Sequence, residues 1–419
     1  MNLLPKKGSD IKAQGKNSDT RASINYRREE NRRYVMALKL SDRHKWILQS
    51  EIRNMSLECG RMGGINLSQG VCDTEVPLVV RRGAQEAIDA GFNTYTRYDG
   101  LDELRIAIAE EQKRFTGMDM NPESEIVVSA GATGALYCTC LALLNPGDEV
   151  ILFEPYYGYH INTLVATQAV PVYVRMLAPD WSFSYDDLDQ VKTSRTRAMI
   201  VNTPANPSGK VFTQNEMETI ASFAIKNDLI VFTDEIYEHF LYDQNRHIAL
   251  ATLPGMKERT ITISGLSKTF SITGWRIGYC LSEARWAQTI GYFNDLVYVC
   301  APAPLQIGVA KGLMNLGPEY YEGLLTAYLI KRNKICSALS QADMKPYIPQ
   351  GAYYVLADMT AVPGNSGKEK AMNLLRKTGV ASVPGGAFYH DDGGENLARF
   401  CFAKEDHILD EACERLVRR

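Results

Sequence analysis

The sequence contains no apolar run that approaches the roughly 20 residues of a membrane-spanning helix. Its N-terminus lacks the apolar core of a signal peptide. A net charge of −3 provides no broad basic surface, so we expect neither nucleic acid nor an anionic membrane as a partner. These absences predict a soluble, cytoplasmic protein.

Disulfide and metal-binding patterns are also missing. The nine cysteines and six histidines are scattered, and only Cys138 and Cys140 lie close together. Their spacing fits neither a disulfide framework nor a zinc motif. We therefore predict reduced, buried thiols and no bound metal.

Five short runs rich in β-branched residues are separated by helix-like segments such as 133–144 and 216–226. The runs are apolar throughout and do not alternate, as expected for strands that are covered on both faces. This pattern predicts an α/β fold with a doubly wound, mainly parallel sheet. The runs lie at 125–129, 149–153, 198–202, 229–233 and 260–263.

A second domain is expected because 419 residues exceed the roughly 250–300 residues of a single core. After Pro304 the pattern changes to long helical stretches, which indicates a smaller α+β domain. Later strands are expected near 352–356 and 398–402, with a closing helix at 405–418. The predicted division is a large domain at 71–305 and a small domain formed by 35–70 and 306–419.

Residues 1–34 are polar, with nine basic and four acidic side chains. This composition predicts an extension that is disordered or loosely docked, in preference to a functional arm.

Ligands of open α/β sheets bind beyond the carboxyl ends of the strands. Lys268 follows the run at 260–263, and Arg276 comes shortly after it. A desolvated lysine near a second cation has a lowered pKa and can attack an aldehyde, while the guanidinium fork of Arg276 suits a phosphate. For this segment alone, a surface lysine on a loop is the alternative.

The segments after the other runs each leave two interpretations. Asp234 is either the partner of a protonated pyridine nitrogen or a helix cap. Asn206 either hydrogen-bonds a phenolate or belongs to a turn, and Tyr157 either stacks on a flat cofactor or packs in the core. The small residues at 131–134 begin a helix whose N–H groups can bind an anion, although such a loop alone is weak evidence.

Together these segments resemble the class I/II aminotransferases of fold type I, which use pyridoxal 5′-phosphate (PLP). The most specific motif is Ser267-Lys268-Thr-Phe-Ser-Ile-Thr-Gly-Trp-Arg276-Ile-Gly-Tyr, preceded by Asn206-Pro-Ser-Gly209 and Asp234-x-x-Tyr237. The resemblance extends from about Asn66 to the C-terminus. It implies a PLP-dependent transferase fold and an enzyme that moves an amino group between an α-amino acid and a 2-oxo acid.

The resemblance also implies a role for each matching residue. Lys268 would form the Schiff base with the cofactor and carry the proton, Asp234 would pair with the ring nitrogen, and Tyr237 and Asn206 would bind the phenolate oxygen. The implied phosphate ligands are Arg276, the backbone at Gly131, Ala132 and Thr133, and either Ser267 or Ser264, with Tyr157 stacked on the ring.

Three further residues match the family pattern outside the cofactor site. Gly70 and Arg399 would bind the substrate α-carboxylate, for which a bidentate arginine is suited. Tyr95 would reach the phosphate of a neighbouring subunit. The resemblance therefore implies a homodimer with shared active sites.

Two segments depart from the commonest members of the family, Gly70-Val-Cys72-Asp73 and the run from Gly385 to His390. Both border the substrate side-chain pocket in the family. With the N-terminal extension, they resemble capreomycidine and enduracididine synthases of arginine-derived natural product biosynthesis. The alternative function is therefore a PLP-dependent lyase or cyclase acting on a hydroxyarginine, whose guanidinium Asp73 and Glu75 are placed to bind.

A third possibility is a non-catalytic PLP-binding regulator, in which this fold is fused to a DNA-binding domain. The residues that precede the resemblance are too few and too polar to form a second core, so we disfavour it.

Overall fold

The computed structural model describes residues 40–45, 47 and 50–418. The chain divides into two units, Met1–Trp46 and Ile47–Arg419. Within the first unit, the described residues contain a 3-10 turn at Asp42–Lys45. The predicted extension at 1–34 lies outside the described residues.

The second unit contains a seven-stranded sheet in the order β2-β8-β7-β6-β5-β3-β4. All neighbouring strands are parallel except β8, which runs antiparallel to β2 and β7. The fold class is therefore α/β with a mainly parallel sheet, as predicted. The strands are β2 (Ile126–Ala130), β3 (Glu149–Glu154), β4 (Val170–Arg175), β5 (Thr196–Asn202), β6 (Ile230–Asp234), β7 (Thr260–Ser264) and β8 (Ile277–Leu281).

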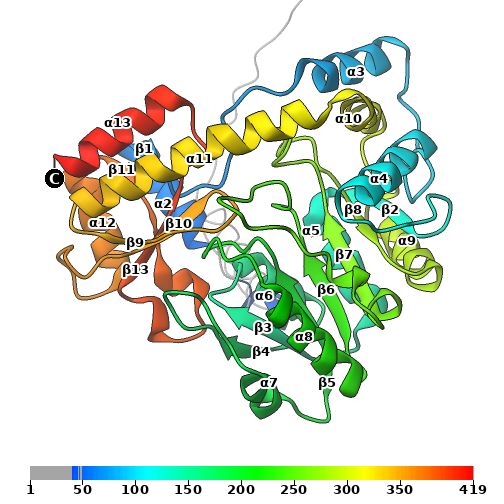
Figure 1. Cartoon of the computed structure of the whole chain (residues 1–419), viewed down its shortest axis with the longest axis horizontal. Helices are drawn as coiled ribbons and strands as arrows, with labels where there is room; N and C mark the ends of the chain where they lie inside the picture. Colours follow the sequence, from blue (N-terminus) through cyan, green and yellow to red (C-terminus); the bar gives the residue numbers. More distant parts are fainter. Residues whose placement is uncertain (1–39, 46, 48–49, 419) are drawn as a thin grey trace, which may run out of the picture. The chain divides into compact units, whose positions relative to one another are not determined.

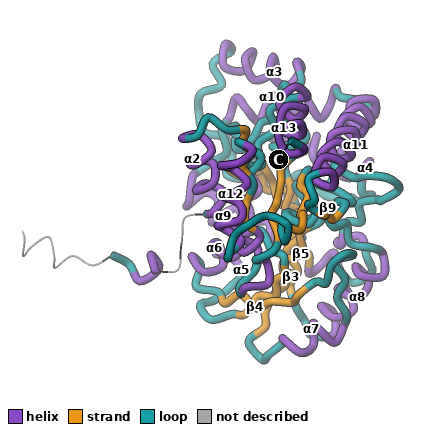
Figure 2. The backbone as a smooth tube through the Cα atoms, turned by 90° about the vertical axis from the view of Figure 1, so that its left-hand side faces the viewer, coloured by secondary structure: helices purple, strands orange, loops and turns teal. Residues whose placement is uncertain are grey.

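Helices lie on both sides of these strands (Figure 2). Along β3, Val150 and Leu152 pack into one core cluster, while Ile151 and Phe153 pack into the other. Successive side chains of a strand point to opposite faces, so a strand with two covered faces is apolar at every position. The helices of this region are α3 (Leu78–Asp89), α4 (Asp102–Phe115), α5 (Gly131–Leu143), α6 (Gly158–Ala166), α7 (Tyr185–Val191), α8 (Gln214–Lys226), α9 (Ala284–Tyr298) and α10 (Ala303–Asn315).

A four-stranded antiparallel sheet follows, in the order β12-β13-β10-β9. The long helix α11 contacts α13 along its side (Figure 1). The short strand β1 (Ile65–Asn66) pairs with β11 (Val380–Ala381), which joins an early segment to this late region. The other elements are α2 (Glu51–Arg61), α11 (Pro318–Gln341), β9 (Lys345–Tyr347), β10 (Tyr354–Asp358), α12 (Gly367–Thr378), β12 (Val383–Pro384), β13 (Leu397–Cys401) and α13 (Asp406–Val417), with 3-10 turns at Leu250–Thr252, Lys257–Arg259, Gly385–Phe388 and Asp392–Gly394.

Every strand of the seven-stranded sheet lies within 71–305, the range predicted for the large domain. The domain boundaries themselves stay a prediction, because residues 47–419 form one compact unit by their contacts.

Helix α8 begins at Gln214, two residues before the predicted start. Thr213 accepts a hydrogen bond from the Glu216 N–H, and the Glu216 side chain accepts one from the Thr213 N–H, so the capping box extends the first turn.

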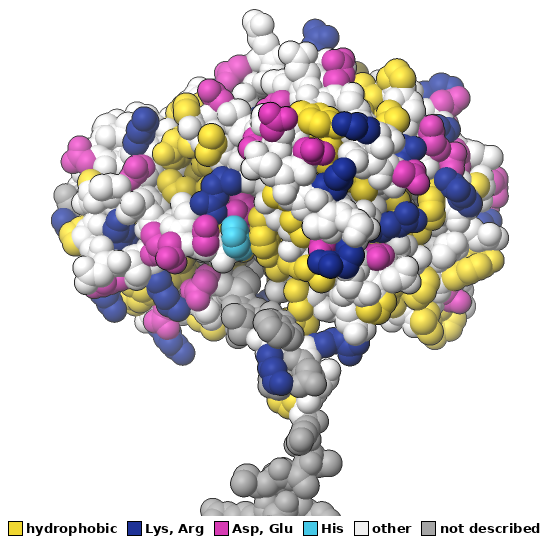
Figure 3. Space-filling view, turned by 90° about the horizontal axis from the view of Figure 1, so that it is seen from below, with side chains coloured by type: hydrophobic (Ala, Val, Ile, Leu, Met, Phe, Trp, Pro, Cys, Tyr) yellow, Lys and Arg dark blue, Asp and Glu magenta, His cyan; other side chains and the backbone are white. Residues whose placement is uncertain are grey.

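The described part of the chain has no helix long and apolar enough to cross a membrane. On the face drawn in Figure 3, acidic and basic side chains are intermingled. This face has no broad patch of one charge, as expected from the small net charge.

Candidate active site

A cavity of about 490 Å³ lies beyond the carboxyl ends of β5, β6 and β7. This is where an open parallel sheet binds its ligands. Lys268, Asp234, Tyr237 and Asn206 all line it. It also brings together the predicted residues Ala132, Thr133, Tyr157, Ser267 and Arg276.

Lys268 is enclosed by aromatic and backbone groups. Its Nζ donates to the Gly70 carbonyl at 3.4 Å and lies 5.8 Å from the ring centre of Tyr237. Burial lowers the pKa of Lys268, and the charge of Arg276 acts in the same direction. A larger share of neutral amine makes this lysine a better nucleophile and proton acceptor.

Asp234 ends β6 and is held by two neighbours that the sequence analysis missed. Its Oδ2 lies 2.8 Å from Nε2 of the buried His160, on α6. The Asn202 side-chain amide donates to the Asp234 carbonyl at 2.9 Å. His160 comes three residues after Tyr157, the residue that precedes α6, and the two ring centres are 5.4 Å apart. This short spacing was the available signal.

Arg399 and Asn206 are joined directly, with Arg399 Nη1 donating to Asn206 Oδ1 at 2.7 Å. Arg399 Nη2 donates to the Ser68 carbonyl at 2.6 Å, and the guanidinium lies 4.2 Å from the ring centre of Tyr354. Within the described chain its Nε is buried without a hydrogen-bond partner. A buried guanidinium nitrogen left unpaired is costly, and an anionic ligand would satisfy it.

Tyr237 also has a partner that the sequence analysis missed. Its hydroxyl lies 3.0 Å from the hydroxyl of Tyr354. Burial raises the pKa of Tyr237, so the hydroxyl keeps its proton and remains a donor.

The start of α5 forms a cradle with Arg276. Gly131 has a φ of +75°, and a Cβ there would lie 2.3 Å from Arg276 Nη2. Only glycine therefore lets the guanidinium approach the free N–H groups of the helix. A cation placed at the positive end of a helix is favourable only with an anion between them, which fits a phosphate group.

The sequence-predicted residues Ser264 and Tyr95 lie elsewhere. Ser264 is fully buried and donates to Glu238 Oε1 at 2.7 Å, so its hydroxyl is not available to the cavity. Ser267, in contrast, lines the cavity, and its role toward a phosphate stays a prediction. Tyr95 is 81% exposed and does not line the cavity of its own chain.

The predicted guanidinium contacts are corrected by the structure. Asp73 is paired with Lys404, whose Nζ lies 2.8 Å from Asp73 Oδ2. Neither Asp73 nor Glu75 lines the cavity described above or the outer cavity next to it. Asp73 therefore already has a cationic partner outside the site.

The outer cavity, of about 370 Å³, adjoins the first and shares Lys268, Asn206 and Tyr157 with it. Gly70 and Arg399 line it, and so do residues of α2, including Arg53.

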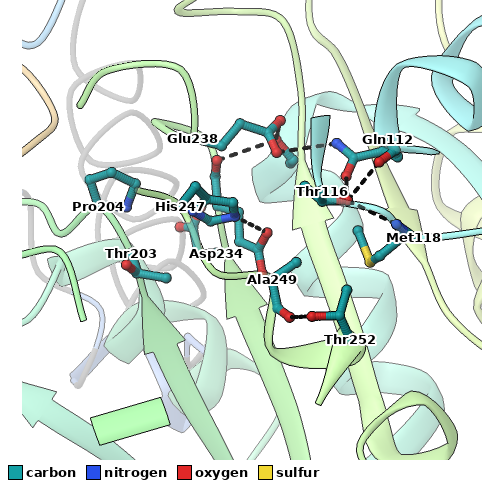
Figure 4. Close-up of polar contacts among 12 residues, drawn as sticks. Gln112, Thr116, Met118, Thr203, Pro204, Asp234, Glu238, His247, Ala249 and Thr252 are labelled. Carbon is teal, nitrogen blue, oxygen red and sulfur yellow. Dashed lines mark hydrogen bonds and ion pairs between the residues drawn. The ribbon is translucent and has the colours of Figure 1, made fainter. Parts of the chain in front are cut away.

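A second polar group, the buried cluster of Glu235, Glu238 and His247, begins directly after β6. Figure 4 shows Glu238 and His247 of this cluster. His247 Nε2 is 2.6 Å from Glu235 Oε2, and Gln112 donates to Glu238 Oε2 at 3.1 Å. One ligand atom from each of the three residues lies within 4.8 Å of the others. The hydrogen bonds of the cluster indicate a structural role, and the absence of a metal stays a prediction.

Comparison with known proteins gives consistent matches. Residues 63–416 match the family model described as aminotransferase class I and II. The chain is 36% identical over 374 residues to "Probable N-succinyldiaminopimelate aminotransferase DapC" of Mycobacterium tuberculosis, a match that covers 86% of this chain and 94% of the relative. It is 32% identical over 396 residues to "Kynurenine--oxoglutarate transaminase" of Dictyostelium discoideum, with 85% and 91% covered.

A solved structure of the N-succinyldiaminopimelate aminotransferase from M. tuberculosis superposes with a TM-score of 0.88 at 34% identity. The superposition covers 91% of this chain and 100% of that one.

Proposed function

The chain belongs to the class I and II aminotransferase family, and from this premise we propose that Lys268 is the residue that binds its cofactor and moves the proton. The family uses PLP to transfer amino groups between amino acids and 2-oxo acids. The observation that carries the proposal is one buried lysine of lowered pKa in a cavity with Asp234 and Arg276.

When bound, PLP supplies an aldehyde that reacts with amines and a ring that withdraws electrons from the substrate Cα. Lys268 Nζ would be the group that bonds to this aldehyde. Burial lowers the pKa of Lys268 and so favours its neutral amine, which would allow Nζ to accept the proton from the substrate Cα.

Asp234 would hold the ring nitrogen, and His160 would hold Asp234. The hydrogen bond from His160 Nε2 fixes Oδ2 of the carboxylate, and Oδ1 accepts from the Ile236 N–H at 3.4 Å. Each carboxylate oxygen can accept a further hydrogen bond, which the ring nitrogen would donate. Asn206 is fixed in the same way, since its Oδ1 accepts from Arg399 and its Nδ2 remains to donate to the phenolate oxygen. Tyr237 would supply the second donor, and Tyr157, which also lines the cavity, would cover the ring.

Arg399 would bind the substrate α-carboxylate, supported by its unpaired Nε and by its place in the outer cavity near Lys268. Gly70 supports the same end of the substrate, because its carbonyl positions Lys268 Nζ. Arg276 and the N-terminus of α5, with Thr133 and Ser267, would bind the phosphate.

A homodimer is part of the proposal. Tyr95 and Leu296 are 81% and 77% exposed, and Phe92 and Tyr292 are about half exposed. Helix α9 contacts the segment that follows Tyr95, since the rings of Tyr98 and Tyr292 are 5.7 Å apart. An apolar surface of this kind favours a second copy, to whose phosphate Tyr95 would reach.

We also propose the cytoplasm as the location, supported by nine free cysteines.

The alternative, cyclisation of a hydroxyarginine, would require a carboxylate for the guanidinium. Among the residues that the structure describes, Asp234 is the only acidic one that lines either cavity, and it already faces His160. The relatives reported above carry the names of transaminases. We therefore place transamination ahead of the capreomycidine- and enduracididine-like reaction.

The test is a single-turnover experiment in which the PLP-loaded enzyme meets one amino acid at a time, including arginine and γ-hydroxyarginine. Transamination predicts loss of the cofactor's absorbance band near the visible range, with a 2-oxo acid detected by mass spectrometry. Return of the original band together with a dehydrated or cyclised amino acid would refute transamination and identify the alternative.

A further inference from the structure

The run from Gly385 to His390, which departs from the commonest family pattern, lies against the end of β3. The Tyr156 N–H donates to the Phe388 carbonyl at 2.9 Å, and the His390 N–H donates to Glu154 Oε1 at 2.7 Å. No residue of this described run lines either of the two cavities. The run therefore meets the residues that end and follow β3, and not the ligand space itself.

Glu154 is the last residue of β3, and its side chain is fully buried. Its Oε1 lies 2.9 Å from His390 Nδ1, and its Oε2 accepts from Arg175 at 3.1 Å. A carboxylate can only accept, so Nδ1 of His390 donates in this contact. Because a buried charge is costly without partners, the carboxylate and the two side chains that donate to it hold one another in place.

Two residues of β4 hold the same segment of the chain. Arg175 Nη2 donates to Asp391 Oδ1 at 2.6 Å, and its guanidinium lies 5.2 Å from the ring centre of Tyr389. The ring of Tyr173 stacks on that of His390, with centres 4.4 Å apart and planes 4° apart. The neighbouring parallel strands β3 and β4 therefore hold three consecutive residues at their carboxyl ends.

Phe388, two residues before His390, packs against the residue proposed to bind the substrate. Its side chain is buried, and its ring centre lies 5.1 Å from the Arg399 guanidinium. The ring of Tyr354 lies against the same guanidinium. A guanidinium that is held in one orientation loses less freedom when it forms two parallel hydrogen bonds with a carboxylate.

We propose that Glu154 and His390 are positioning residues for substrate binding. By holding residues 389–391 at the ends of β3 and β4, they keep Phe388 against Arg399 and so keep the guanidinium aligned with the substrate α-carboxylate. This inference rests on the proposed function, because it requires Arg399 to bind that carboxylate. Release of the segment would weaken every ligand that binds through a carboxylate and would leave the cofactor bound as before.

The first test compares His390→Ala with His390→Asn, whose side-chain amide can donate from nearly the position of Nδ1. The matched control is His407→Ala, a histidine of α13 whose side chain is 71% exposed. The His390 side chain is 45% exposed, so its truncation should leave the protein folded.

The readout is steady-state kinetics of the PLP-loaded enzymes with the best substrate of the single-turnover experiment. His390→Ala is expected to raise KM by about 3- to 10-fold and to leave kcat within about twofold of the wild type. His390→Asn should restore most of the affinity, and His407→Ala should match the wild type.

The second readout separates the carboxylate from the cofactor. Binding of propionate to the PLP-loaded enzyme is followed by the absorbance of the cofactor, and so is the reaction with methoxyamine, an amine without a carboxylate. His390→Ala should weaken propionate by the same 3- to 10-fold, or about 1 kcal/mol, and leave the methoxyamine rate unchanged.

The third test concerns the pairing of the two residues. Glu154→Ala, assayed well below its measured midpoint of unfolding, should raise KM more than His390→Ala does, because it also releases Arg175. Adding His390→Ala to this variant should change KM little further. Fully additive increases in KM would overturn the shared role.

Unchanged propionate binding in His390→Ala, or equal changes for propionate and methoxyamine, would overturn the positioning role. A His390→Asn variant as weak as His390→Ala would overturn it as well. If propionate binding weakened as expected while no amino acid was transaminated, the proposed function would be refuted and the positioning of Arg399 would stand.

Discussion

Two groups of polar residues adjoin each other at the end of β6. One lines the ligand cavity, and the other is buried and contributes to the stability of the fold. Asp234 lines the cavity, while Glu235, the next residue, belongs to the buried cluster behind it. Successive side chains at the end of a strand point to opposite faces, so two adjacent carboxylates enter different environments. Residue type and position along the chain therefore do not by themselves mark a functional acid.

The two sides differ in what their charges face. On the cavity side, Arg399 keeps an unpaired nitrogen and Arg276 lies beside a helix N-terminus. In the buried cluster, Glu235 is paired with His247, and Glu238 accepts from Ser264 and Gln112. Glu235 Oε1 and His247 Nδ1 also lack a hydrogen-bond partner among the described residues, but these residues line neither cavity. We infer that the first set is completed by ligands and that the second set stabilises the turn that carries Asp234 and Tyr237.

The largest effect is expected for Lys268→Ala. This change removes the proposed nucleophile and base, so kcat should fall by about 10⁴-fold. The measurement is steady-state transamination, with thermal unfolding of the cofactor-free protein as a control that should change little. Residual turnover near the wild-type rate would show that another group takes the proton.

The second-largest effect is a loss of stability, expected for a variant of the buried cluster. Glu235→Ala leaves His247 without its buried partner, and such a change costs about 3–5 kcal/mol of unfolding free energy. Urea denaturation of the variant measures it. The double variant Glu235→Ala with His247→Ala should recover part of the loss, whereas purely additive losses would contradict a direct pairing.

The strands below the site were predictable because they are apolar at every position. The runs predicted at 198–202, 229–233 and 260–263 match β5, β6 and β7 within a few residues. Strand β4 was missed because it is a partly exposed edge strand that contains Pro171, and β8 because a glycine interrupts it.

The site was predictable where residues follow strands in a recognisable motif, as Lys268 and Asp234 do. The hydrogen-bond partners of these residues within the site were not predictable. His160 contacts Asp234 across 74 residues, and Tyr354 contacts Tyr237 across 117. Contacts between distant segments depend on how the strands assemble, which no local pattern contains. Arg53 was missed because the packing of α2 decides which helix face meets the cavity.

On the cavity side, Asp234→Asn should lower kcat by about 10²- to 10³-fold, because a neutral amide cannot stabilise a protonated ring nitrogen. The loss should be kinetic, with unfolding free energy nearly unchanged, which is the reverse of the Glu235 variant. His160→Ala should also lower kcat, but by less than Asp234→Asn, since the histidine acts through Asp234. If Asp234→Asn lowered the unfolding free energy as much as Glu235→Ala does, the cavity residues and the buried cluster would not differ in their roles.

The smallest effect is a pH dependence of stability that comes from Glu238. Burial raises its pKa from 4.5 to about 7, with the charge of Glu235 acting in the same direction and His247, Ser264 and Gln112 opposing it. Tyr279, whose hydroxyl lies 3.3 Å from Glu238 Oε1, completes the groups that face it.

Between pH 4.5 and about 7 the folded protein keeps a proton on Glu238 that the unfolded chain has released. Stability from this group is therefore complete below pH 4.5 and falls as the pH rises to about 7, by at most about 3 kcal/mol. Glu238→Gln cannot titrate, so its urea midpoints should decline less over this range than those of the wild type. If the urea midpoints of the variant and the wild type changed with pH in parallel, Glu238 would carry a charge in the folded state at every pH in the range. The buried cluster would then need a second cation besides His247.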